Sequence, residues 1–292
     1  MKLIADWITA PENSARTVLV TIFGDTILPV TDEVWLAQLF RLTDPMGFTD
    51  RLVRTSVFRL AADGWLDNER VGRQSRYRLT QLAKSETIDA SERIYRDVYA
   101  DWTGPWCTVF VGTPILSDDD RSRLRESLTW HGFMEISPGV LATPTVDGDR
   151  CRSLCRAALP DADVPTGTLN FDDLNTALAR GFFDQVLAFE ETAQAYREFM
   201  AVYNPIAEGL GKLDGKQGFA LRTMLVHDLR RVRLRSVDLP TDLLPADWSG
   251  AEANVLASEL YHGLSDLAAP WLSEVLDLQY PAKFPDRLTD RT

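Results

Sequence analysis

The order of helix-forming and strand-forming segments in the first 80 residues leaves few folds open to this chain. Capping residues and apolar spacing predict three helices: one from Ser14 to Gly24, one that begins at Thr31 and ends before Pro45, and one from Thr49 to Asp63. Two alternating strands that meet at a turn around Gly72 follow directly. Three helices followed by a two-stranded hairpin predict a winged helix-turn-helix, whose third helix enters the major groove of DNA.

The predicted third helix has two chemically different sides when its residues are placed about 100° apart. One side is mostly apolar and holds Leu52, Val53, Ser56, Val57 and Leu60. The other holds Arg51, Arg54, Thr55 and Phe58, with Arg59 at its margin. Guanidiniums, a hydroxyl and an aromatic ring can contact phosphates, guanine edges and thymine methyl groups, so we expect this second side to bind DNA. Alternatively, the arginines are solvated and Phe58 packs under the wing.

The predicted hairpin is strongly basic. The stretch from Arg70 to Arg78 contains four arginines and no acidic residue. We expect four side chains of this hairpin to contact DNA, chiefly at phosphates: Arg70, Arg73, Gln74 and Arg76. The alternative is a solvated surface hairpin.

The composition excludes several classes of protein. With 292 residues, 45% of them hydrophobic and 25% charged, the chain is expected to form two or three globular domains. No apolar run approaches the roughly 20 residues of a membrane-spanning helix, and the N-terminus lacks the apolar stretch of a signal peptide. Three cysteines are too few for a disulfide scaffold. We therefore expect a cytoplasmic protein that has no membrane partner.

The net charge of −12 is unevenly distributed. Residues 1–80 hold ten basic and ten acidic residues, so the rest of the chain carries the entire excess of acidic groups. Overall acidity argues against a protein that coats nucleic acid indiscriminately, but it leaves room for a local basic face that reads DNA.

Several segments, in the right order, resemble a known family. TVLVTIFGD, DRLVRTSVFRLAADGWL and VGRQSRYRLT are similar to the N-terminal domain of PaaX-type repressors of phenylacetate degradation. SERIYRDVYADWTGPWCTVFVG and LRTMLVHDLRRVRLRSVDLPTDLLPADWSGAEA resemble later parts of that family, and the resemblance covers residues 14–275. It implies a homodimeric repressor of a palindromic operator, a Cas2-like middle domain, and release from DNA by an acyl-CoA effector, phenylacetyl-CoA.

The residues of the middle segment independently support a ferredoxin-like fold. Strands are predicted at 106–112, 133–137, 140–144 and 168–172, with helices after Ser117 and at 147–159. A Cas2-like nuclease would need a carboxylate at the end of the first strand, where the sequence has Val111, Gly112 and Thr113. Cys151 and Cys155 are an incomplete set of zinc ligands. We expect buried thiols, no metal, no other cofactor and no catalytic residue.

The C-terminal segment is predicted to be mostly helical. One helix holds Arg222, His227 and Arg230, which could face the phosphates of coenzyme A. Alternatively, the arginines pair with acidic residues of the segment 81–292, which carries the net charge of −12, and His227 is a core histidine bonded to a backbone carbonyl or a carboxylate. The proline-containing segment 238–250 is expected to clamp over helices, with Trp248 as a packing anchor.

Together these features predict an α+β protein with four parts. The parts are a winged helix-turn-helix at 1–80, a helical linker at 81–105, a ferredoxin-like Cas2-like domain at 106–180 and a mostly helical domain at 181–292. The expected function is repression of a phenylacetate catabolic operon, relieved by an aryl-acyl-CoA. The alternatives are a regulator of a different acyl-CoA pathway, an enzyme such as a Cas2-like nuclease or a thioesterase, and a protein-binding adaptor.

Overall fold

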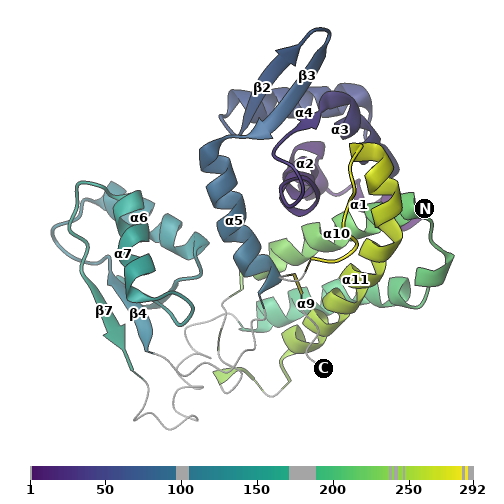
Figure 1. Ribbon diagram of the computed structural model, residues 1–292. Coiled ribbons are helices and arrows are strands. Elements are labelled where there is room, and N and C mark those ends of the chain that lie inside the picture. The colour runs from purple at the N-terminus through teal and green to yellow at the C-terminus, as the bar shows by residue number, and fades with distance from the viewer. Residues whose placement is uncertain are drawn as a thin grey trace. The chain divides into compact units, whose positions relative to one another are not determined.

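The computed structural model describes residues 2–96, 105–170, 189–236, 239, 243–245, 247–284, 287 and 288, and Figure 1 shows its helices and strands. The chain forms two compact units. The first comprises residues 1–96, 199–231 and 253–292, and the second comprises residues 97–198 and 232–252. Each unit is thus assembled from segments that are far apart in the sequence. The four-part division along the sequence stays a prediction.

The first unit contains the predicted winged helix (Figure 1). Its N-terminal elements are α1 (Lys2–Trp7), η1 (Pro11–Asn13), α2 (Ala15–Ile22), the π-helical turn η2 (Phe23–Ile27), β1 (Val34–Trp35), α3 (Leu36–Thr43), η3 (Asp44–Met46), α4 (Asp50–Ala62), β2 (Leu66–Val71), β3 (Gln74–Leu79) and α5 (Gln81–Tyr95). The hydroxyl oxygens of Ser14 and Thr49 cap α2 and α4, as predicted. Gly64 follows α4 with a φ of +73°, a backbone conformation that favours glycine.

The second predicted helix begins later than expected. Thr31 does not cap it, because its hydroxyl oxygen accepts a hydrogen bond from the Glu33 amide (3.3 Å) within a turn. Val34 and Trp35 instead form β1, which pairs antiparallel with β3. The physical reason is that a β-branched and an aromatic residue suit a strand, and the edge of β3 offers them backbone hydrogen bonds. α3 starts after Trp35, whose amide donates to the side chain of Gln38 (2.9 Å).

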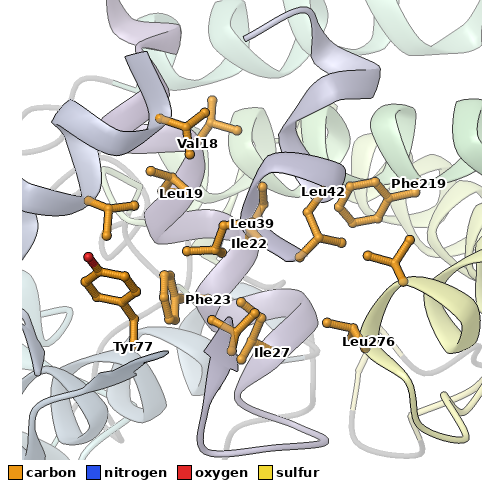
Figure 2. Packing of buried hydrophobic residues seen from close by; sticks show 14 of the residues in the cluster. Val18, Leu19, Ile22, Phe23, Ile27, Leu39, Leu42, Tyr77, Phe219 and Leu276 are labelled. Carbon is orange, nitrogen blue, oxygen red and sulfur yellow. The ribbon is translucent and has the colours of Figure 1, made fainter. Parts of the chain in front are cut away.

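One apolar core joins the winged helix to the C-terminal helices α10 (Gly215–Arg233) and α11 (Ser249–Leu276). Figure 2 shows part of this core and labels Val18, Leu19, Ile22, Phe23, Ile27, Leu39, Leu42, Tyr77, Phe219 and Leu276. Phe219 comes from α10 and Leu276 from α11. The two helices approach closely, since a Cβ atom on Gly218 would lie 2.9 Å from the Cβ of Leu267. Because these contacts remove apolar surface from water, the winged helix depends on α10 and α11 for part of its stability.

A buried group of charged and hydroxyl side chains, the Asp25 cluster, connects the same elements. Asp25 lies in η2, which extends the first helix past its predicted end. Its carboxylate pairs with the guanidinium of Arg222 on α10 (3.0 Å) and with that of Arg287 (2.8 Å). The hydroxyls of Tyr95 and Tyr261 also donate to Asp25 Oδ1, over 2.7 and 3.0 Å. These five residues come from η2, α5, α10, α11 and the segment after α11.

The charges of the Asp25 cluster stabilise one another. Burial alone would raise the pKa of the Asp25 carboxyl, but the guanidiniums of Arg222 and Arg287 hold that pKa below its ordinary value. The carboxylate therefore stays ionised at neutral pH. Because folding lowers this pKa, the contribution of Asp25 to stability is present above the ordinary carboxyl pKa and is lost as the pH falls through the lowered one.

The second unit contains the predicted ferredoxin-like fold. Its elements are β4 (Trp106–Phe110), α6 (Asp118–Trp130), β5 (Met134–Ser137), β6 (Val140–Thr143), α7 (Gly148–Ala158) and β7 (Thr166–Leu169). The strands lie in the order β5-β6-β4-β7, with every neighbouring pair antiparallel. Helix α9 (Phe189–Ala207) contributes to both units. The β-α-β-β-α-β order and this strand arrangement confirm the fold class of the middle domain.

Other predictions for the second unit have different outcomes. Cys107, Cys151 and Cys155 are buried, as expected for structural thiols. Trp248 packs edge-on against Phe189 and Tyr196, which confirms it as a packing anchor. The clamp expected at 238–250 falls partly outside the described residues, as does the end of the strand predicted at 168–172.

No helix in the part of the chain that the structure describes is long and apolar enough to cross a membrane.

The Asp25 cluster makes a prediction for stability. Replacing Arg222 by Met keeps much of the side-chain volume but leaves the buried Asp25 carboxylate with one fewer cation, and breaking a buried pair costs about 3–5 kcal/mol. Arg41→Met breaks an exposed pair with Glu274, which should cost roughly 0–1 kcal/mol. Denaturant unfolding at neutral pH measures both free energies. Equal losses for the two variants would contradict a stabilising role of the cluster.

Candidate nucleic-acid interface

The solvent side of α4 carries the residues expected to read DNA. Five side chains are exposed there: Arg51, Arg54, Thr55, Phe58 and Arg59. Val53, Ser56, Val57 and Leu60 are buried on the opposite side, as the helical spacing predicts, whereas Leu52 is 46% exposed and does not join them. Phe58 is 71% exposed. Packing of Phe58 under the wing is therefore wrong, and its ring faces solvent.

The local structure holds this face in place. The Thr49 hydroxyl caps α4, and Gly47, with a φ of +82°, makes the turn that leads into it. The guanidinium of Arg54 lies over the ring of Phe40 on α3, 5.4 Å from its centroid. The Thr55 hydroxyl donates to the Arg51 carbonyl (2.9 Å), which leaves its oxygen able to accept. The face thus offers cationic, hydroxyl and apolar groups at defined positions.

The tip of the wing is exposed and basic. β2 and β3 pair in register around Gly72, whose φ of +62° allows the tight turn. Arg70, Arg73 and Gln74 are exposed around this turn. Their positions suit contacts with a phosphate backbone.

Two arginines nearer the base of the wing are engaged within the protein. Arg76 forms ion pairs with Glu33 and with Glu69 (2.7 Å for Glu69), and its guanidinium lies 5.5 Å from the ring centroid of Trp35. Arg78 lies 3.5 Å from the Asp67 carboxylate. The expected phosphate contact of Arg76 stays a prediction, but this side chain already links β1 to both wing strands.

These pairs follow from the hairpin register. A turn at residues 72 and 73 places Glu69 directly opposite Arg76 and Asp67 directly opposite Arg78. Opposite charges at facing positions attract each other across a sheet. Both carboxylates, of Glu69 and Asp67, precede the basic stretch that begins at Arg70, so the charge of that stretch does not reveal them. The register itself could have identified them.

The residues expected to bind an effector are spread over α10. Arg222 is fully buried, and its guanidinium donates to Thr26 and Tyr280 (3.0 Å each) besides pairing with Asp25. Its effector contact stays a prediction, since a ligand would reach it only if these bonds opened.

His227 is also buried within the first unit. Its Nδ1 lies 2.9 Å from the Thr21 hydroxyl, and its ring packs edge-on against Trp7. Burial, with Arg230 and Arg231 nearby, lowers the pKa of His227 to about 3, so the imidazole is neutral at physiological pH. This agrees with the alternative of a core histidine.

Arg230 is half-buried, and burial lowers its pKa. Its neighbour Arg231 pairs with Glu12 (3.3 Å). Arg222 and Arg231 thus form ion pairs, as the alternative expected, but with Asp25 and Glu12, which lie outside the segment 81–292. Their carboxylate partners come from the N-terminal segment, which sequence spacing could not indicate.

Comparisons with known proteins find similarity in three successive segments of the chain. Three family models match: PaaX-like protein over residues 14–83, the PaaX protein central Cas2-like domain over residues 99–165, and the PaaX-like protein C-terminal domain over residues 188–274. The Transcriptional repressor PaaX of Escherichia coli (strain K12) is 29% identical over 270 residues, which cover 89% of this chain and 84% of the relative.

A solved structure also resembles the chain. The uncharacterized protein Rv0674 from Mycobacterium tuberculosis aligns with a TM-score of 0.54 at 23% identity, covering 90% of this chain and 97% of that one. This similarity supports the fold.

The exposed face of α4 predicts a sequence-specific role for Arg54. A bidentate contact between arginine and guanine contributes about 1–3 kcal/mol of discrimination. Arg54→Ala should therefore weaken binding to the operator and relax specificity at the base pair that Arg54 contacts. Electrophoretic shifts with the operator and with single-base variants measure this change. Equal losses on operator and scrambled duplex would place Arg54 on the DNA backbone.

The wing predicts a difference between its tip and its base. Each phosphate contact that is lost should reduce the slope of log affinity against log salt concentration by about 0.9. We expect this change for Arg70→Ala and Arg73→Ala, but a smaller one for Arg76→Ala, because Arg76 is already paired with two carboxylates. Fluorescence anisotropy titrations at several salt concentrations measure the slopes. An unchanged slope in an Arg70→Ala, Arg73→Ala double variant would remove the wing tip from the interface.

Proposed function

Since the chain belongs to the PaaX family of transcriptional repressors, we propose that it represses an operon for the catabolism of an aromatic acid. The expected acid is phenylacetate. The observation that carries the DNA-binding part of this proposal is the solvent side of α4, where Arg51, Arg54 and Phe58 are exposed. The curated relative is a repressor, so the family points to a regulator and not to an enzyme.

The charge distribution supports selective DNA binding. The exposed arginines of α4 and of the wing tip lie on a protein whose net charge is −12. The acidic remainder repels DNA, so attraction is concentrated at one basic face. A repressor must leave the many non-specific sites of a genome, and weak overall attraction favours this.

We further propose that the protein binds a palindromic operator as a homodimer. One winged helix reads only a short half-site, and two-fold symmetry places two reading helices on equivalent half-sites. The described chain presents one such helix, α4.

The proposed effector is an aryl-acyl-CoA, with phenylacetyl-CoA as the first candidate. A ligand releases a repressor only if it binds the DNA-competent and the incompetent state with unequal affinity. In an aryl-acyl-CoA, the acyl part has an aromatic ring that can be buried, and the coenzyme A part has phosphates that can pair with cationic side chains. The free acid lacks the phosphates.

A cavity in the second unit is a place where such a ligand could bind. It has a volume of about 610 Å³ and is lined by the loop between β6 and α7, by Arg152 and by residues 166–168 of β7. This volume is within the range of about 300–1,000 Å³ that is usual for ligand pockets. Arg152 supplies a cation at its edge, although it also pairs with Asp149. Arg222, His227 and Arg230 remain candidates only if α10 opens.

The effector proposal predicts a ligand-dependent loss of operator binding. Moving the population from 99:1 to 1:99 requires about 5.5 kcal/mol of differential affinity. Calorimetric titration with phenylacetyl-CoA and with phenylacetate should show binding of the thioester and much weaker binding of the acid. An operator shift should then reverse with the thioester. If neither compound binds, or the thioester binds without releasing DNA, the effector belongs to a different pathway.

A further inference from the structure

We propose that Arg287 is a positioning residue for operator recognition. It fixes the turn between α2 and α3 and, through that turn, the orientation of α4 and the wing. This inference rests on the proposed function, because it concerns how the DNA-reading surface is set. The matched family regions end at residue 274, so they give Arg287 no role.

Arg287 binds three oxygen atoms of η2. Its guanidinium donates to the backbone carbonyl oxygens of Gly24 (3.0 Å) and Asp25 (2.7 Å) and to the Asp25 carboxylate (2.8 Å). It also stacks on the ring of Tyr95, with 4.4 Å to the centroid. The planar group with five donors suits several acceptors at fixed angles, which a lysine ammonium cannot reproduce. Arg287 therefore determines the geometry of this turn and not only its charge.

The turn is in contact with the elements that read DNA. Phe23, the first residue of η2, packs edge-on against Trp65, with 5.8 Å between ring centroids. The backbone amide of Trp65 donates to the Leu60 carbonyl of α4 (2.9 Å), and the Trp65 carbonyl accepts from the Thr80 amide after β3 (3.1 Å). Trp65 thus connects the C-terminal end of α4 to Thr80, the residue that follows the second strand of the wing. A shift of η2 would change the angle between α4 and the wing.

Arg287 is itself held from the other side. The next residue, Leu288, donates its amide to the Tyr95 carbonyl (3.3 Å) and accepts from Ser258 (2.7 Å) on α11. His262, also on α11, lies 2.8 Å from the same Leu288 carbonyl oxygen. Leu288 has a φ of +46°, a left-handed conformation that leucine seldom adopts. The bonds to α5 and α11 fix this conformation, so Arg287 transmits the position of α11 to η2.

The test compares the same substitution at two ion pairs between the winged helix and other parts of the first unit. Arg287→Lys keeps the charge but loses the multiple donors, whereas Arg41→Lys alters the exposed pair with Glu274 on α11. The probes are the duplex that the wild-type protein selects from a randomised pool and a scrambled duplex of the same composition. Thermal melting checks that both variants are folded at the assay temperature.

We expect Arg287→Lys to lower the ratio of selected to scrambled affinity at least about fivefold, the lower end of coupling between sites. Affinity for the scrambled duplex and the salt slope should stay at wild-type values, because Arg287 contacts no phosphate in this proposal. Arg41→Lys should leave the ratio unchanged.

Other outcomes overturn the inference. If Arg287→Lys weakens both duplexes equally, Arg287 only maintains the folded state. If the ratio stays at the wild-type value, η2 does not set the reading geometry. A wild-type protein that selects no sequence would refute the proposed function as well.

If Arg287→Lys is not folded, Ser258→Ala provides the same test. It removes a donor to Leu288 and loosens the support of Arg287. A reduced ratio with unchanged scrambled binding supports the proposal, and an unchanged ratio overturns it.

Discussion

The pairing of one buried carboxylate with two guanidiniums determines how the first unit is assembled. Asp25 is almost completely buried, so its negative charge is tolerable only next to Arg222 and Arg287. Those partners come from segments far along the chain: Arg222 lies on α10, and Arg287 lies in the segment after α11. Their ion pairs hold these segments against η2. The winged helix consequently shares its interior with α10 and α11. The apolar core in Figure 2 likewise combines residues of the winged helix with Phe219 of α10 and Leu276 of α11. In this protein, the DNA-reading fold is one part of a larger unit.

This arrangement offers a physical basis for regulation. A ligand that moved α10 or α11 would act on groups already bonded to η2, because Arg222 and the anchors of Leu288 lie on those helices. Packed interiors shift between discrete arrangements more readily than they deform continuously. A change at the C-terminal helices could therefore alter the spacing of α4 and the wing without any ligand near the DNA.

The sequence predicted local structure well wherever short-range spacing decides it. Ser14, Thr49 and Ser117 are caps as expected, and the inner side of α4 follows the helical period. The sequence did not predict structure that depends on a partner far away in the chain. Val34 and Trp35 form a strand only because the edge of β3 is present, and the role of Arg222 depends on Asp25, nearly 200 residues earlier. For the candidate site, the exposed residues of α4 could be read from the sequence, whereas the pairing of Arg76 required the hairpin register.

The separation between Asp25 and Arg287 also affects how the protein is made. The two residues are 262 positions apart, and a ribosome adds about 5–20 residues per second, so roughly 13–50 seconds pass between their syntheses. During that interval the Asp25 carboxylate lacks Arg287, and for most of it Arg222 as well, because Arg222 is made nearly 200 residues after Asp25. If Arg287 sets the reading geometry as proposed, the DNA-binding surface is completed only late in translation, although its residues are made first.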